Sequence, residues 1–358
     1  MVKYRFIKTQ TKLRELCEEL EKHEVIAIDL ECENNLHHYG SYVSIIQISA
    51  GNKNWVVDVL ELKEIEPLKE ILESRKITKI FHDVSFDLRI LKSELGIEPK
   101  NLFDTQIAAL LVGEKNVGLA SLLEKFFNVQ KESKFQMADW TIRPINPDMI
   151  SYAVKDTAYL ISLKNLLEQK IKELGREEWL RQELEHLEEK DYEQRDLTFE
   201  DVKGVSRLEP RQKIFAQLIY DEREKVAKQK DKPVHRIISN KKIIDLVQNP
   251  PKENEWKTIK AIHPGFKHKL KSLYYQAQNT KIQIEPKTRK ERKNYTETQK
   301  QQLQELEDAR VKIGTEHAIE PYLVMSKEQV HETVRQKNYD TLRPWQRELI
   351  QKETKLFQ

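Results

Sequence analysis

VIAIDLE, residues 25–31, is the stretch that decides the fold. Its leading apolar residues predict a buried strand, and two carboxylates, Asp29 and Glu31, stand at the end of the apolar run. Side chains two residues apart in a strand lie on the same face, so both carboxylates should point to one place. Taken alone, such a pair is more often turn or capping chemistry than a metal site.

Two more acidic motifs follow. Asp87 lies in FHDVSFDLRIL, and Asp156 lies in SYAVKDTAYL, where Tyr152 stands four residues earlier. Residues four apart share one face of a helix, so Tyr152 and Asp156 should lie one turn apart. Carboxylates that converge repel one another unless cations bind between them, and ligand sets made only of oxygen suit Mg²⁺ or Mn²⁺. The four carboxylates therefore predict a site for two divalent metal ions, an arrangement that hydrolyses phosphodiester bonds.

In this order, the motifs resemble those of the Asp-Glu-Asp-Asp superfamily of 3′→5′ exonucleases, in its tyrosine-bearing branch, and specifically ribonuclease D. The resemblance covers about residues 20–185 and rests on IDLE, HDVSFDLRIL, NLFDTQIAALL, GLASLLEKFF, MADWTIRPI, ISYAVKDTAYL and LGREEWLRQE. It implies an α/β fold of the ribonuclease H-like exonuclease type over residues 1–190. One segment departs from the family, because SKFQMADW has Ser133 and Lys134 in the reverse of the usual order.

The resemblance also implies roles for the five residues. Asp29 would bridge two divalent ions about 4 Å apart, Glu31 and Asp156 would complete one site, and Asp87 would hold the other largely through water. The Tyr152 hydroxyl would orient the attacking water and help to remove its proton. The product would be a nucleoside 5′-monophosphate. The family's substrates suggest RNA 3′ ends, those of transfer RNA precursors and other structured RNAs.

Positive charge is concentrated in one part of the chain. From Lys203 to Lys300 there are twenty-five Lys and Arg against eleven Asp and Glu, a net charge of +14; because the whole chain carries +3, the other residues carry −11. A basic segment beside an acidic nuclease favours a clamp for nucleic acid, and a solvated helix surface is the plain alternative. If the segment is a clamp, a chain cut after about residue 200 should keep its chemistry and lose affinity for long or structured RNA.

Residues 203–280 resemble the HRDC domain, a helical module shared by helicases and ribonuclease D. The pattern predicts a long amphipathic helix that ends near Arg223 and Glu224, a break at Lys232-Pro233, a helix capped near Ser239, a stop at Pro250-Pro251 and a closing helix after Pro264-Gly265. The candidate phosphate contacts are Lys241, Lys242, Lys257, Lys260, Lys267, Lys269 and Lys271. In the loop after the first motif, His38 and Tyr39 could stack on a terminal base, or they could be ordinary exposed loop residues.

The remaining residues are predicted as a linker and a last helical segment. Residues 281–298 contain Pro286 and mixed charges without an apolar period, which is typical of a linker. Residues 299–358 resemble the second, divergent HRDC-like repeat of ribonuclease D. No apolar run reaches membrane-spanning length, and the start MVKYRFIKTQTK lacks the apolar stretch of a signal peptide. We therefore expect a cytoplasmic protein, a monomer without a membrane partner.

Two other functions stay open on the sequence. A DNA exonuclease with the same chemistry is the nearer one, because the carboxylates do not read the 2′-hydroxyl. The direct junction of the exonuclease and HRDC segments, with no helicase between them, favours RNA. A scaffold that binds nucleic acid without catalysis is the other alternative, but it would have no need for clustered repulsive carboxylates.

Some polar residues near the motifs are expected to be structural. His82 at a strand end is expected to be a satisfied core histidine rather than a ligand, and Asp104 in LFDTQ is expected to cap a helix. Trp140 and Arg143 are expected to be structural as well, with a phosphate contact as the alternative for Arg143. The two cysteines, Cys17 and Cys32, are too few for a disulfide framework.

Overall fold

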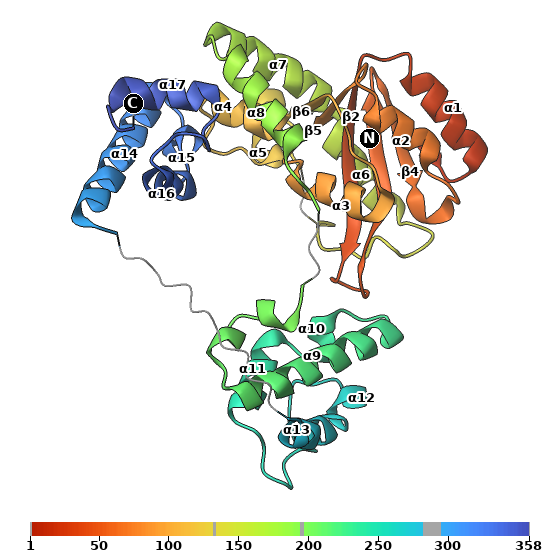
Figure 1. Ribbon diagram of the computed structural model, residues 1–358. Coiled ribbons are helices and arrows are strands. Elements are labelled where there is room, and N and C mark those ends of the chain that lie inside the picture. Colours follow the sequence, from red (N-terminus) through yellow and green to blue (C-terminus); the bar gives the residue numbers. More distant parts are fainter. Residues whose placement is uncertain (1, 132–133, 194–196, 282–294, 358) are drawn as a thin grey trace. The chain divides into compact units, whose positions relative to one another are not determined.

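The computed structural model describes residues 2–131, 134–193, 197–281 and 295–357 (Figure 1). The chain forms two compact units. The first unit comprises Met1–Glu31, Val43–Glu193 and Glu291–Gln358, and the second comprises Cys32–Tyr42 and Gln194–Lys290. The C-terminal stretch therefore returns to the unit in which the chain begins.

In the described residues, a six-stranded sheet forms the centre of the α/β half. In spatial order its strands are β1 (Arg5–Ile7), β4 (Lys53–Asp58), β3 (Ser41–Ala50), β2 (Val25–Asn34), β5 (Thr78–Phe81) and β6 (Leu102–Asp104). β3 and β4 are antiparallel, whereas β1 pairs with β4, β5 with β2 and β6 with β5 in parallel. The strand predicted in VIAIDLE is confirmed as β2, and β2, β3 and β4, which follow one another in the chain, lie side by side in the sheet. The short strands β1 and β6 were missed, because three residues hold too little alternation to identify.

The helices of this half follow the strands in the chain. They are α1 (Gln10–Leu20), the 3-10 helix η1 (Val59–Glu61), α2 (Glu66–Glu73), α3 (Ser85–Leu95), α4 (Thr105–Leu111), α5 (Leu119–Phe127), α6 (Pro147–Ala158), α7 (Leu160–Glu173) and α8 (Glu177–Glu189). Apolar residues at helical spacing give each long helix a buried face; in α1 these are Leu13, Leu16 and Leu20.

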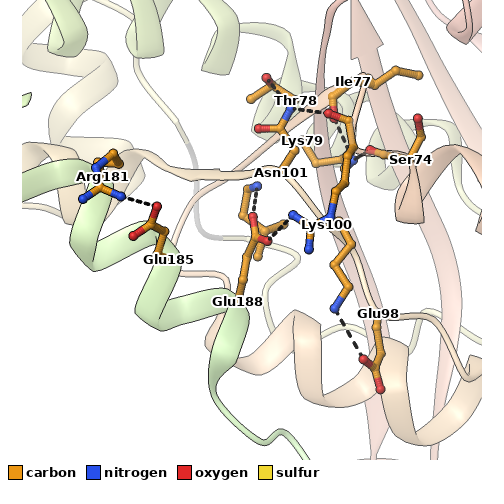
Figure 2. A network of polar contacts seen from close by, with 12 residues as sticks. Ser74, Ile77, Thr78, Lys79, Glu98, Lys100, Asn101, Arg181, Glu185 and Glu188 are labelled. Carbon is orange, nitrogen blue, oxygen red and sulfur yellow. Dashed lines mark hydrogen bonds and ion pairs between the residues drawn. The ribbon is translucent and has the colours of Figure 1, made fainter. Parts of the chain in front are cut away.

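A polar network ties the end of α8 to the edge of the sheet (Figure 2). The Glu188 carboxylate accepts hydrogen bonds from the Leu102 backbone N–H at 2.9 Å and from the Arg75 guanidinium at 3.5 Å. On β5, the Lys79 side chain is fully buried, and its ammonium donates to the carbonyl oxygens of Ser74 and of Ile77, the latter at 2.7 Å. Burial lowers the pKa of Lys79 to about 8.

The C-terminal helices α14 (Glu297–Glu316), α15 (Pro321–Val324), α16 (Lys327–Gln336) and α17 (Pro344–Glu353) belong to the first unit. Figure 1 shows α17 beside α8. Leu306, Ile313 and Trp345 of this segment join one apolar cluster with Leu111 and Leu180 of the α/β half. The C-terminal segment is therefore part of the hydrophobic core that supports the sheet, and does not form a core of its own.

Stacking and buried hydrogen bonds hold the C-terminal segment in place. The rings of Trp179 in α8 and Trp345 in α17 are stacked, with centroids 4.6 Å apart. The Arg176 guanidinium donates to the Leu111 carbonyl at 2.5 Å and to the His317 carbonyl at 2.6 Å. A single buried cation thus satisfies backbone acceptors on both sides of the contact.

Close backbone packing supports the same conclusion. Gly113, after α4, has a φ of +88°, and a Cβ atom placed there would lie 2.4 Å from the Ala318 carbonyl oxygen. We expected that a chain cut after about residue 200 would keep its chemistry. That expectation took all residues beyond the cut to lie outside the core of the exonuclease unit, and the packing of the C-terminal helices shows that this premise is wrong. Such a cut removes α14–α17 and exposes the apolar surface that they bury.

The second unit contains one long helix, α9, and several short helices around its own core. They are the 3-10 helices η2 (Phe199–Asp201) and η3 (Val205–Arg207), followed by α9 (Pro210–Lys230), α10 (Val234–Ile237), α11 (Asn240–Gln248), α12 (Pro264–Lys267) and α13 (Leu270–Asn279). Phe215, Trp256 and Phe266 are buried in an apolar cluster of this unit. The predicted helix order is confirmed, including the cap at Ser239, whose hydroxyl accepts from the Lys242 N–H at 3.2 Å.

Helix α9 is longer than predicted. It continues past Arg223 and Glu224 to Lys230, because Val226 and Ala227 extend its buried face and Asp231 ends it in the left-handed conformation. Of the predicted linker, residues 282–294 lie outside the described residues, and α14 begins at Glu297, with Thr296 as its N-cap. The boundaries and HRDC character of residues 203–280 and 299–358 stay predictions. No helix in the described ranges is long and apolar enough to span a membrane.

Candidate active site

Strand β2 places the first two carboxylates. Ile26, Ala27 and Ile28 are fully buried, and the strand continues beyond them to Asn34. Asp29 and Glu31 therefore lie within the strand rather than just past its end, and both are partly exposed. Because a strand alternates its side chains, the two carboxylates project from the same face.

Helix α6 carries Tyr152 and Asp156. The Asn146 side chain caps the helix by accepting from the Asp148 N–H at 2.8 Å, and Pro147 occupies the first turn. Tyr152 is 9% exposed and Asp156 is 4% exposed. The helix predicted for this motif is confirmed, and it places the two side chains one turn apart on a buried face.

Three of the four carboxylates converge. Ligand oxygens of Asp29, Glu31 and Asp156 all lie within 4.8 Å of one another. Burial raises the pKa of Asp29 well above its ordinary value, and the charges of Asp156, Asp87 and Glu31 raise it further. Burial and then the charge of Asp156 raise the pKa of Glu31 in the same way. A cation bound between these groups would relieve their repulsion.

Asp87 lies near this group of three but outside it. It is in the first turn of α3 and is 8% exposed. Burial, followed by the charges of Asp104 and Asp83, raises the pKa of Asp87 to about 8. Its own charge raises the pKa of Asp29 and of Glu31. Asp87 thus acts electrostatically on the other three carboxylates, but it is not part of the group whose ligand oxygens all lie within 4.8 Å of one another.

Aromatic side chains hold the ring of Tyr152. Phe135 makes an edge contact with a centroid distance of 5.8 Å, and Trp140 lies at 6.4 Å. Burial is the largest cause that raises the pKa of Tyr152 above its ordinary value. The hydroxyl therefore stays protonated at neutral pH, and it can both donate and accept a hydrogen bond.

Lys131 is the residue that sequence reasoning missed. It lies between α5 and α6, and its ammonium forms an ion pair with Asp156 and lies 5.1 Å from the ring centroid of Tyr152. Burial raises the pKa of Asp156 to about 6, and the charge of Lys131 limits that rise. The available signal was the departure at Ser133 and Lys134, which points to neighbouring positions rather than to Lys131.

The donor set fits a divalent metal ion. Asp29, Glu31 and Asp156 offer only carboxylate oxygens, and these lie close enough to share one ion. Hard cations such as Mg²⁺ and Mn²⁺ prefer such donors. Asp87 lies at the edge of the group, where it could hold a second ion directly or through water.

Asp104 caps a helix, as expected, and His82 is paired at one of its two ring nitrogens. The Asp104 carboxylate caps α4 by accepting from the Gln106 N–H at 2.7 Å, and it also accepts from the Val84 N–H at 2.9 Å, at the start of α3. His82 Nδ1 lies 2.8 Å from the Thr105 hydroxyl, and burial lowers the pKa of His82 to about 4. Asp104 therefore fixes the helix that carries Asp87.

Trp140 and Arg143 are structural as well. Trp140 is 3% exposed and packs on Tyr152. The Arg143 guanidinium donates to the Asp58 carboxylate at 2.7 Å and to the Trp140 carbonyl at 2.6 Å. These bonds use the guanidinium to join β4 to the segment before α6.

His38 and Tyr39 contact the helical unit, to which they belong. His38 Nδ1 lies 2.6 Å from an Asp231 carboxylate oxygen, and the Tyr39 hydroxyl donates to Glu224 at 3.3 Å. The Tyr39 ring packs against the apolar cluster of that unit. Stacking of these side chains on a terminal base stays a prediction.

The predicted lysines of the helical unit differ in their surroundings. Lys241, Lys257 and Lys260 are exposed, whereas Lys242, Lys267, Lys269 and Lys271 are partly buried. Lys269 forms an ion pair with Glu222, and Lys271 forms one with Glu253. A groove of about 720 Å³ beside Lys241 is also lined by Lys203 and Arg207, which the sequence did not single out.

Comparison with known proteins shows which class of protein the chain resembles. Residues 4–172 match the family model described as 3′–5′ exonuclease. This part of the chain is therefore similar to 3′–5′ exonucleases. The particular proteins that it resembles are ribonuclease D and RRP6, so the resemblance to ribonuclease D seen in the sequence is confirmed.

The similar proteins cover the chain to different extents. The exosome complex exonuclease RRP6 of Saccharomyces cerevisiae is 36% identical over 167 residues, which are 46% of this chain and 23% of that protein. Ribonuclease D of Nitrobacter hamburgensis is 25% identical over 73% of this chain and 69% of its own length. The chain thus matches less than a quarter of the yeast protein and about two thirds of the bacterial one.

A solved structure confirms the fold over almost the whole chain. The crystal structure of Escherichia coli ribonuclease D, at 22% identity, superposes with a TM-score of 0.72 and covers 98% of this chain and 97% of that one. The predicted fold class, a ribonuclease H-like exonuclease domain followed by a helical region, is confirmed.

Proposed function

We propose that this protein is a metal-dependent 3′→5′ exoribonuclease that releases nucleoside 5′-monophosphates. The carrying observation is the convergence of Asp29, Glu31 and Asp156 within 4.8 Å, beside Tyr152. The family match supports the direction of hydrolysis. The ribonucleases among the similar proteins support RNA as the substrate.

The four carboxylates divide the binding of metal ions. Asp29 would be the shared ligand, because its oxygen lies within 4.8 Å of those of Glu31 and Asp156, and the charge of Asp87 also acts on it. Glu31 and Asp156 complete one site with it, and Asp87 serves the second. Two Mg²⁺ or Mn²⁺ ions held there would stabilise negative charge on the phosphate and on the leaving 3′ oxygen.

Tyr152 positions the attacking water. Its ring is fixed by Phe135 and Trp140, so the hydroxyl is held at a set place beside Asp156. Because burial raises the pKa of Tyr152, the hydroxyl acts as a neutral hydrogen-bonding group rather than as a phenolate base. It would orient the water by accepting a hydrogen bond from it.

The substrates that we propose are RNA 3′ ends, including those of transfer RNA precursors. DNA is the alternative substrate, since no carboxylate distinguishes the two sugars. We place the enzyme in the cytoplasm and expect a monomer.

End-labelled RNA and DNA strands of matched sequence test the chemistry and the substrate together, with Mg²⁺, Mn²⁺ or a chelator present. RNA labelled at its 5′ end should shorten one nucleotide at a time, and the chelator should stop the reaction. Internal cuts, or hydrolysis that continues in the chelator, would contradict the proposal. Equal rates of hydrolysis on RNA and DNA would mean that the enzyme is a general exonuclease without specificity for RNA.

The helical unit is proposed to bind the body of the RNA through an HRDC-like surface. Its exposed lysines, above all Lys241 beside the groove lined by Lys203 and Arg207, are the strongest candidates. Lys271 is a matched control, because Glu253 already pairs with it. In the Asp29→Asn background, Lys241→Ala should make the slope of log affinity against log salt shallower by about 0.7 to 0.9. Lys271→Ala should leave that slope nearly unchanged. Equal slopes in the two variants would mean that Lys241 does not belong to the RNA-binding surface.

A further inference from the structure

Lys131 stands inside the carboxylate site and has no role in the hydrolysis described so far. Its side chain is 16% exposed, and its ammonium is paired with Asp156, which is itself 5% exposed at the side chain. The same ammonium lies over the ring of Tyr152, 5.1 Å from the centroid. Among the residues that the structure describes, Lys131 is the cation that forms an ion pair with one of the four carboxylates.

Burying an ammonium is costly unless a carboxylate compensates for it. Here the compensation is mutual, because the positive charge of Lys131 lowers the pKa of Asp29, Glu31 and Asp156 against the upward effect of burial. Lys131 thus relieves the same repulsion that a divalent cation would relieve. A metal ion and the ammonium are like charges that use the same Asp156 carboxylate, so each weakens the binding of the other.

We propose that Lys131 is a further active-site residue, a built-in counter-ion that competes with the divalent cation for Asp156 and moves to the substrate phosphate when RNA enters. This inference rests on the metal site of the proposed function. A phosphate group offers the ammonium another anionic partner. The exchange frees Asp156 for the metal ion, so metal and RNA bind more tightly together than either does alone.

The neighbouring residues supply controls. Lys134 lies three positions further along the chain and is exposed. Its ammonium lies over the ring of Phe135, 5.0 Å from the centroid. Lys134→Gln therefore removes one positive charge from the segment without touching Asp156. Lys131→Gln removes the charge but keeps a donor that can bind Asp156, which favours a folded protein. Lys131→Arg keeps the charge and should restore the wild-type behaviour.

Mn²⁺ binding, measured by electron paramagnetic resonance without RNA, tests the competition. Lys131→Gln should bind Mn²⁺ about tenfold more tightly than the wild type, and Lys134→Gln should match the wild type within twofold. Saturating uridine 5′-monophosphate, a product that offers a phosphate, should raise the Mn²⁺ affinity of the wild type more than that of Lys131→Gln. The rise in melting temperature with Mn²⁺ should follow the same order, which gives a second readout of binding.

The failures of the two proposals are distinguishable. If the wild type binds no Mn²⁺ and Asp29→Asn behaves identically, the metal site itself is absent. If the wild type binds Mn²⁺ and Lys131→Gln binds it with the same affinity, with and without the nucleotide, the metal site stands and the competing role of Lys131 is overturned.

Discussion

Two helical segments of this chain are buried in different ways. In residues 203–280, Trp256 is covered by Phe215 and other residues of the second unit. In the C-terminal segment, Trp345 is stacked on Trp179 of the α/β half. One segment has its own core, and the other completes the core of the exonuclease unit.

The two units also differ in the residues that bear on function. The first unit holds the converging carboxylates and needs its C-terminal helices to cover its apolar surface. Residues 203–290 of the second unit make up most of the stretch that carries a net charge of +14, and the unit contains no carboxylate of the site. The comparison therefore predicts that chemistry and stability of the site depend on the C-terminal segment, whereas RNA affinity depends on the second unit.

The largest expected effect comes from Asp29→Asn. Turnover should fall by at least about 10⁴-fold, because the change removes the carboxylate that we propose both ions share. The melting temperature should stay the same or rise, since one repulsive charge is lost. RNA affinity measured without divalent metal ions, which we assign to the second unit, should change little. Asp148→Asn, an exposed change on the helix of Tyr152 and Asp156, is the control; near wild-type nucleotide release by folded Asp29→Asn protein would contradict the metal model.

Trp345 and Trp256 offer a matched pair of variants, with one buried tryptophan in each unit. Trp345→Ala should lower the free energy of unfolding of the first unit by about 3–5 kcal/mol, and Trp256→Ala should do the same to the second unit. Only Trp345→Ala should lower the temperature at which short RNA strands cease to be hydrolysed. Calorimetry together with turnover over a temperature series checks both. If Trp256→Ala inactivates the enzyme at the lower temperature instead, the assignment of cores to function is wrong.

Tyr152→Phe removes one hydroxyl and keeps the packing of the ring. Turnover should drop by roughly 10²-fold, while RNA affinity and melting temperature change little. The measurement is single-turnover hydrolysis of a short strand at saturating enzyme. An unchanged rate would make Tyr152 a packing residue only, held between Phe135 and Trp140.

The smallest expected effect is a pH dependence that belongs to the first unit. The pKa of Lys79 is about 8 in the folded protein and about 10.4 in an unfolded chain. Between these values the unfolded chain binds more protons, so stability rises with pH, by about 2 kcal/mol from pH 8 to pH 9.5. Denaturant unfolding of the wild type and of Lys79→Met over this range isolates the effect. If the stability difference between the two proteins does not change with pH, the low pKa of Lys79 is wrong.

The residues of the site could be predicted from the sequence more fully than the packing of the helices around them. The period of two in VIAIDLE and of four in SYAVKDTAYL identified carboxylates that the fold does bring together. Such periods predict which face of an element is buried, but not which partner covers it. For that reason residues 299–358 could be predicted as helical, and their place in the core around Trp179 could not.

Lys131 was missed for a related reason. A lysine in a short connecting segment has no period, and its ion pair with Asp156 exists only after α6 has folded against the sheet. The C-terminal end of α9 was predicted too early for a local reason. Asp231 ends the helix in the left-handed conformation without a glycine, so no glycine marked the end in the sequence.

The division between the two units is tested most directly by replacing residues 197–290 with a flexible Gly-Ser linker of equal length. The measured quantity is the ratio of kcat/KM for a folded transfer RNA precursor to kcat/KM for a short single strand. The replacement keeps α14–α17 and the carboxylates, so turnover of the short strand should stay within about threefold, while the ratio should fall by about 10²-fold as phosphate contacts are lost. An unchanged ratio would mean that the positive charge is only a solvated surface, and loss of turnover on the short strand would mean that the site depends on the second unit after all.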